Sequence, residues 1–119
     1  MNTSAEGVTF YKRWRLRRGV TVDAVRRFVE GEIVPRYAAL SPEVELGLEA
    51  DTDGLSVLAI QRWSSVEAHQ RATTGAAYEA WWSEYEPRLV AWDDLVDFAD
   101  EWATKPVDLR AGGERSRER

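Results

Sequence analysis

The first ordered part of the chain alternates between apolar and polar residues. One face of residues 7–19 carries Val8, Phe10, Trp14 and Leu16, and the other carries Thr9, Tyr11, Arg13, Arg15 and Arg17. A period of two is that of a β-strand, so this segment is predicted to be the first strand.

Residues 21–40 change to helical spacing. Thr21 is a suitable N-cap, and Asp23 in the first turn suits the helix dipole. Pro35 lies inside the pattern and lacks a backbone N–H group, so we expect the helix to kink near Gly31.

The next two segments predict a hairpin. Valine and leucine alternate with glutamate along residues 42–50, which is typical of a strand with one apolar face. The turn sequence DTDG follows at residues 51–54. Residues 55–63, LSVLAIQRW, are almost continuously apolar, which indicates a strand buried on both faces.

A second helical region follows. Ser64 and Glu67 match the capping box S-x-x-E at its start. The helix is expected to break at Gly75 and to restart over residues 76–89, and Pro87 and the WDD sequence at 92–94 are expected to close the region. Residues 95–104 alternate again and predict a last strand, with Val96, Phe98 and Trp102 on one face.

The element order β-α-β-β-α-β predicts an α+β, ferredoxin-like fold: a four-stranded antiparallel sheet with both helices on one face. Helices on one side leave the other face of the sheet uncovered. Since the strand at 55–63 is apolar on both faces, we expect a homodimer whose sheets pack into a dimeric α/β barrel.

The length of 119 residues fits one domain. We expect a disordered N-terminus at residues 1–6, the domain at 7–104 and a flexible charged tail at 105–119. The net charge is −5, and the tail holds five basic and three acidic residues, which leaves about −7 on the body. An acidic body argues against a nucleic-acid partner. No membrane span or signal peptide is visible, so a cytoplasmic location is expected.

The residue types present exclude several chemistries. The chain has no cysteine and one histidine, which argues against a disulfide, a thiolate nucleophile or a transition-metal site. No G-x-S-x-G elbow, phosphate loop or dinucleotide fingerprint occurs. A metal or organic cofactor is therefore not expected.

Two stretches, EIVPRYAAL and QRWSSVEAHQRATTGAAYEAWW, resemble the dimeric α/β-barrel proteins of the antibiotic-biosynthesis-monooxygenase type. The second stretch is the more specific one. It places a tryptophan at the strand end, two polar residues, a histidine and then an aromatic residue, here Trp63, Ser64, Ser65, His69 and Tyr78. The resemblance covers roughly residues 8–103.

The resemblance implies a pocket between helices and sheet for a small aromatic or polyketide-like molecule. Such proteins include cofactor-independent oxygenases, polyketide cyclases and haem-degrading enzymes. The oxygenases and haem degraders commonly use an asparagine on the sheet, whereas the only asparagine here is Asn2. The haem-degrading pattern puts a histidine ten residues after the tryptophan, where this chain has Thr73. Haem chemistry is therefore not expected.

The candidate catalytic residues are His69, Tyr78 and Asp97. His69 is the natural general acid or base, and the alternative is a histidine with a purely structural role, hydrogen-bonded to the backbone. Asp97 lies in an apolar strand, where a carboxylate is solvated, paired with an arginine such as Arg62, or functional. The candidate substrate-binding residues are Trp14, Phe28, Tyr37, Arg62, Trp63 and Trp82, of which the aromatic ones could equally be core.

These observations favour a small-molecule enzyme of secondary metabolism. The expected activity is that of a cofactor-independent monooxygenase with an aromatic polyketide-like substrate. A polyketide cyclase that uses His69 as acid and base, and a non-catalytic dimer that binds a small ligand, remain the alternatives.

Overall fold

The computed structural model describes residues 7–109 of the chain. The segment 1–6, predicted to be disordered, and residues 110–119 of the predicted flexible tail lie outside the described residues. The four strands are β1 (Val8–Leu16), β2 (Val44–Ala50), β3 (Ser56–Trp63) and β4 (Val96–Thr104). The helical elements are α1 (Val22–Phe28), the π-helical turn η2 (Val29–Ile33), α2 (Val34–Leu40), α3 (Val66–Ala72), α4 (Gly75–Tyr85) and α5 (Arg88–Asp93).

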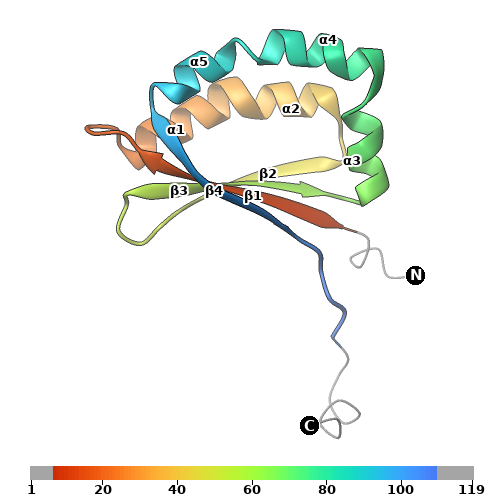
Figure 1. Cartoon of the computed structure of the whole chain (residues 1–119), viewed down its shortest axis with the longest axis horizontal. Coiled ribbons are helices and arrows are strands. Elements are labelled where there is room, and N and C mark those ends of the chain that lie inside the picture. The colour runs from red at the N-terminus through yellow and green to blue at the C-terminus, as the bar shows by residue number, and fades with distance from the viewer. Residues whose placement is uncertain (1–6, 110–119) are drawn as a thin grey trace, which may run out of the picture.

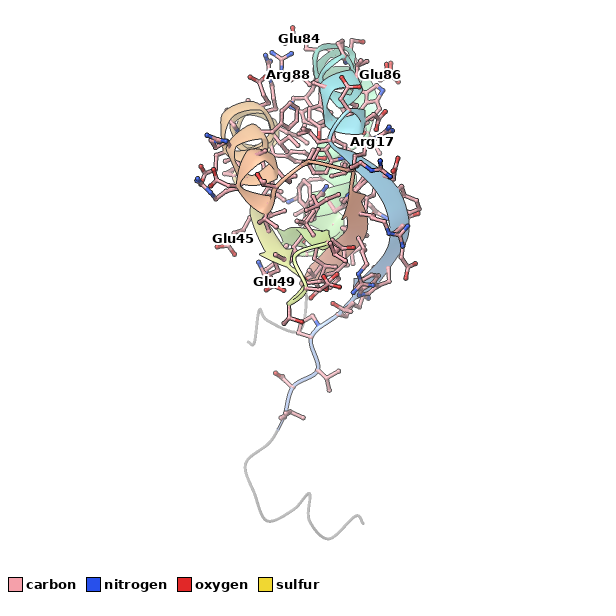
Figure 2. All side chains as sticks on the ribbon, turned by 90° about the vertical axis from the view of Figure 1, so that its left-hand side faces the viewer. Arg17, Glu45, Glu49, Glu84, Glu86 and Arg88 are labelled. Carbon is pink, nitrogen blue, oxygen red and sulfur yellow. The ribbon has the colours of Figure 1, made fainter. Side chains whose placement is uncertain are left out.

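The strands form one sheet in the order β2-β3-β1-β4, and all neighbours are antiparallel. The helices form a layer over one face of this sheet (Figure 1). Side chains of the first helical arm (α1 to α2), the second helical arm (α3 to α5) and the sheet project into the layer between them (Figure 2). This arrangement confirms the predicted α+β ferredoxin-like fold.

The first helical arm starts at the predicted residue and is irregular near Gly31, where a kink was predicted. Thr21 caps it, since its Oγ1 accepts a hydrogen bond from the backbone N–H group of Ala24 at 3.1 Å. The irregularity predicted near Gly31 is present as the π-helical turn η2. Pro35 cannot donate to the carbonyl group of Gly31 four residues earlier, and a wider turn accommodates the missing bond.

The start of the second arm differs from the prediction by one residue. Ser65, and not Ser64, is the N-cap of α3: its Oγ accepts from the backbone N–H group of Ala68 at 3.0 Å. Ser64 instead donates from its Oγ to Oε1 of Glu43 at 2.7 Å, linking the end of β3 to the start of β2. The region ends at the predicted WDD sequence, because α5 ends at Asp93, but Pro87 only interrupts it. Pro87 is the N-cap of a further short helix, α5, that carries Trp92.

The last strand contains a β-bulge that the sequence pattern did not predict. Phe98 pairs with Trp14, but beyond an extra residue at Ala99 the register shifts, and Trp102 pairs with Tyr11. A bulge reverses which residues of a strand face the helices. Phe98 therefore contacts Trp14 edge to face, whereas Trp102 stacks on Tyr11 on the face away from the helices. The prediction that Phe98 and Trp102 share a face was wrong.

The core consists of two clusters between sheet and helices. One contains Val25, Val57, Trp92 and Val96, and the other contains Val8, Trp63 and Ala68. The predicted burial of β3 on both faces holds only at its centre. Val57 and Ile60 point to opposite sides and are 0% and 2% exposed, but on the face away from the helices Leu58 is half-buried and Arg62 is exposed. Each fully buried aliphatic side chain contributes about 1.5–3 kcal/mol by burial. No helix between residues 7 and 109 combines the length and apolar character needed to span a membrane.

Candidate active site between the helices and the sheet

Two adjoining cavities lie between the helical layer and the sheet. An inner cavity of about 190 Å³ lies beneath α2, α4 and α5, and an outer cavity of about 600 Å³ extends from it toward α3 and β4. The two cavities, which together we call the hollow, share Phe10, Lys12, Tyr37, Gln61 and Trp82. The hollow separates the two core clusters at the centre of the molecule.

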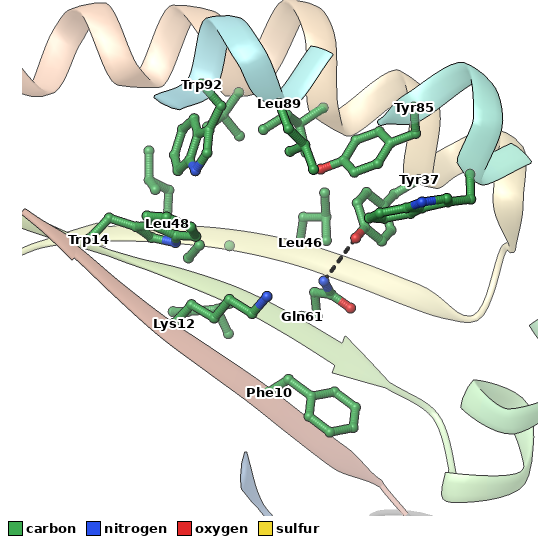
Figure 3. Close-up of a pocket in the computed structure, with 16 residues that line it drawn as sticks. Phe10, Lys12, Trp14, Tyr37, Leu46, Leu48, Gln61, Tyr85, Leu89 and Trp92 are labelled. Atoms are coloured by element: carbon green, nitrogen blue, oxygen red, sulfur yellow. Dashed lines mark hydrogen bonds between the residues drawn. The ribbon is translucent and has the colours of Figure 1, made fainter. Parts of the chain in front are cut away.

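Aromatic side chains from both layers form the walls of the inner cavity. Trp14 and Phe10 rise from β1, and Tyr37, Tyr85 and Trp92 descend from the helices (Figure 3). Flat rings above and below an apolar space are suited to a planar aromatic ligand.

A chain of hydrogen bonds fixes the polar groups at the centre. Gln61 donates from Nε2 to the hydroxyl group of Tyr37 at 3.1 Å (Figure 3). Its Oε1 accepts from Nε1 of Trp63 at 3.1 Å. The hydroxyl groups of Tyr37 and Tyr85 also interact. Burial raises the pKa of both phenols, so both stay neutral at physiological pH and act as hydrogen-bonding groups, not as bases.

Two further side chains with N–H groups, those of Lys12 and Trp14, line the inner cavity. Lys12 extends from β1 and is the only lysine or arginine among the described residues that line either cavity. Nε1 of Trp14, which lines the inner cavity, is buried and has no hydrogen-bond partner within residues 7–109. A buried N–H group without a partner is costly, so this indole is an unsatisfied polar group beside the inner cavity.

His69 lies on α3 and lines the outer cavity. Its ring lies 4.7 Å from that of Phe10 and meets Trp63 edge to face at 5.1 Å between centroids. Burial lowers the pKa of the His69 imidazole, so the neutral form with a free nitrogen lone pair predominates at neutral pH. Within residues 7–109 no hydrogen bond holds this ring, so its tautomer is free to adapt to a ligand.

Five of the residues predicted from the sequence line the hollow. His69 and Tyr78 line the outer cavity, Trp14 lines the inner cavity, and Tyr37 and Trp82 line both. They come from β1, α2, α3 and α4, so the fold brings together residues far apart in the chain.

The other four predicted residues lie elsewhere. Phe28 packs against Trp92 in the core, and Trp63 is buried beneath the hollow, where it contacts His69. Arg62 lies on the opposite face of the sheet. Its guanidinium group packs closely over Gly47: a Cβ atom on that residue would be only 3.0 Å from Nη1 of Arg62.

Asp97 also lies outside both cavities. Its Oδ1 is 3.0 Å from Nη2 of Arg17, and both side chains are about half exposed. Arg62 is not its partner. The structure therefore does not bring Asp97 to the imidazole of His69.

The residues of the hollow that were not among the predicted site residues include Lys12, Gln61, Tyr85 and Trp92. Lys12 could have been recognised in the sequence as a charged residue on an apolar strand face, because it lies on the same face as Phe10 and Trp14. Gln61 likewise interrupts an apolar strand face. A polar residue on a face otherwise directed at the core is informative.

Comparison with solved structures identifies proteins of the same architecture. SnoaB of Streptomyces nogalater, a cofactor-independent oxygenase, is 19% identical with a TM-score of 0.56, and the match covers 88% of this chain and 97% of SnoaB. A provisionally named antibiotic biosynthesis monooxygenase from Chloroflexus aurantiacus is 14% identical with a TM-score of 0.52, over 90% of this chain and 99% of that one. The chain has the fold of the antibiotic-biosynthesis-monooxygenase-like proteins.

This fold is also shared with a NIPSNAP family protein of unknown function from Agrobacterium tumefaciens. That protein is 19% identical with a TM-score of 0.62, over 89% of this chain and 93% of its own. No family model and no curated protein matches the sequence. The resemblance seen in the sequence is thus confirmed as a shared fold, and the activity has to be argued from the hollow itself.

Proposed function

We propose that the protein is a small-molecule enzyme of secondary metabolism, a cofactor-independent monooxygenase that binds an aromatic polyketide-like substrate in the hollow. The observation that carries this proposal is a neutral imidazole, that of His69, at the wall of an aromatic cavity between helices and sheet. The similarity in fold to SnoaB, itself a cofactor-independent oxygenase, supports it.

In this reaction the substrate supplies the electrons. His69 removes a proton from an acidic carbon of an anthrone-like ring, and the resulting carbanion, which is delocalised as an enolate, transfers an electron to O2. The two radicals combine into a peroxide, which loses water to leave a second carbonyl group. One anthrone and one O2 thus give one anthraquinone and one H2O. The apolar walls exclude bulk water from the carbanion.

A cyclase is the second candidate. It is favoured by the absence of an asparagine other than Asn2 from the whole chain. In that case His69 would move protons during aldol closure of a polyketone folded within the same hollow, and no O2 would be consumed.

We also propose that the protein is a homodimer. On the sheet face away from the helices, Trp102 stacks on Tyr11 and Arg13 lies over the Trp102 ring at 5.3 Å. Leu58, which pairs with Arg13 and is half-buried on the same face, adds an apolar side chain. A second copy packed sheet to sheet would cover this surface.

Oxygen uptake tests the activity. In buffer with a chelator, 1,8-dihydroxyanthrone is added to the wild-type protein, to His69→Gln and to Gln70→Leu, and the rate without protein is subtracted. Gln70 is the exposed neighbour on the same helix. We expect one O2 consumed per quinone formed by wild type and Gln70→Leu, and strong loss in His69→Gln.

The other outcomes separate the candidates. Tight binding of the anthrone with no O2 uptake would remove the oxygenase proposal and leave the cyclase or a binding protein. Ring closure of a polyketone without O2 uptake would identify the cyclase. Uptake that is unchanged in His69→Gln would overturn the role of this residue.

A further inference from the structure

Lys12 lies where the inner and outer cavities meet, and neither the oxygenase nor the cyclase mechanism above uses it. It is one of only two lysines in the chain, the other being Lys105. It stands on the sheet face between Phe10 and Trp14, so its aliphatic stem runs through an apolar wall. The side chain stays about half exposed, so its ammonium group is hydrated and open to an anionic ligand at the mouth of the inner cavity.

The partner that the protein itself provides is a weak one. Nζ of Lys12 is 3.9 Å from Oε1 of Glu101, and the two side chains are 53% and 62% exposed. A long, solvated ion pair of this kind holds its members loosely. The ammonium group is therefore free to bind a ligand oxygen.

The surroundings of Lys12 define what the ligand looks like. Phe10, Trp14 and Trp82 line the inner cavity together with Lys12, and their rings suit a planar ring system as ligand. Besides Lys12, the inner cavity is lined by the polar side chains of Tyr37, Gln61 and Tyr85 and, within residues 7–109, by no carboxylate. A cation beside neutral hydrogen-bonding groups selects an oxygen that carries negative charge.

We propose that Lys12 binds an acidic oxygen of the aromatic ligand, a phenolate or enolate, and favours its ionised form. This inference rests on the proposed function, since it takes the hollow as the ligand site. For an oxygenase, the ammonium group would stabilise the enolate formed when His69 removes the proton. Lys12 thereby specifies hydroxylated or enolised rings over neutral ones.

Binding of a coloured phenol tests this directly. Alizarin, a dihydroxyanthraquinone, changes its absorption spectrum on ionisation, and 1,2-dimethoxyanthraquinone is the matched compound that cannot ionise. Both are titrated into wild type, Lys12→Met, Glu101→Gln and Lys105→Met, after circular dichroism has shown that each variant is folded. Lys105→Met removes the same charge outside the hollow.

We expect wild-type protein to lower the apparent pKa of bound alizarin and Lys12→Met to abolish that lowering. Lys12→Met should weaken alizarin binding about tenfold or more while dimethoxyanthraquinone binds as before, because a charge-assisted hydrogen bond is lost. Glu101→Gln should tighten alizarin binding, because it removes the competing carboxylate. Lys105→Met should behave like wild type.

The failures are distinguishable. If both dyes bind to the wild-type protein, and Lys12→Met lowers the apparent pKa of bound alizarin as much as wild type does, the proposed role of Lys12 is wrong. The hollow then remains the ligand site. If neither dye binds to the wild-type protein, the proposed function fails, and the inference fails with it. Reductive methylation gives an independent readout: bound alizarin should protect Lys12 and leave Lys105 reactive, and equal labelling of both would contradict the proposal.

Discussion

Gln61 on β3 donates a hydrogen bond to the hydroxyl group of Tyr37 on α2 at 3.1 Å, and this bond joins the sheet to the helical layer inside the hollow (Figure 3). Gln61 also accepts a hydrogen bond from Trp63, so one carboxamide fixes two aromatic side chains. The hollow is therefore held open by a specific polar link between its two walls.

Replacing Gln61 by leucine should destabilise the protein. The change leaves the indole N–H group of buried Trp63 without an acceptor, which costs about 1–3 kcal/mol of unfolding free energy. Urea unfolding measures the loss. Gln70→Leu is the control, because Gln70 is exposed, and it should change the unfolding free energy little. Equal stability of the two variants would show that the link contributes nothing.

The rate of the proposed reaction should depend on pH through His69. A general base must be neutral, and burial lowers the pKa of this imidazole below its ordinary value of about 6.5. Activity should therefore be on a plateau at neutral pH and fall as the pH drops through the lowered pKa. The pH profile of kcat/KM measures this, and His69→Gln should lower the rate by about a hundredfold or more. A profile of unchanged shape in that variant would contradict the assignment.

Trp102→Asp should convert the proposed homodimer to a monomer, because it places a charge on the face where Trp102 stacks on Tyr11. Analytical ultracentrifugation of both proteins gives the molar masses. Val90→Asp is the matched control, since Val90 is 69% exposed on α5, on the helical layer. A wild-type protein that sediments as a monomer would remove the dimer from the account.

Asp97→Asn should leave turnover almost unchanged. The carboxylate forms a half-exposed ion pair with Arg17 away from both cavities, and such pairs contribute at most about 1 kcal/mol. Steady-state kinetics and thermal unfolding check both statements. A large loss of kcat in a folded Asp97→Asn protein would restore this residue to the catalytic candidates.

Most of the fold could be predicted because it follows from hydrophobic periodicity. The hairpin turn at 51–54 and the cap at Thr21 are local signals, and both occur as expected. The bulge at Ala99 could not be predicted in this way. One extra residue in a strand leaves its composition unchanged and is recognised only in the pairing with β1. The six-residue helix α5 is too short for its periodicity to be recognised after Pro87.

The site could be predicted only in part, for a related reason. Aromatic residues and the single histidine attract notice by their type, and several of them line the hollow. The role of Gln61 depends on Tyr37, a residue 24 positions away that only the folded chain brings near. Lys12 could have been recognised as a charge on an apolar strand face, but the cavity into which it extends could not.

The central claim is that an aromatic ligand occupies the hollow between helices and sheet. The most direct test is the ¹H–¹⁵N spectrum of the six tryptophan indole groups during titration with alizarin, assigned through single tryptophan-to-phenylalanine variants. The indole signals of Trp14 on the sheet side and Trp82 on the helix side should both shift, because both side chains line the inner cavity. Binding of alizarin with both signals unchanged would contradict the account.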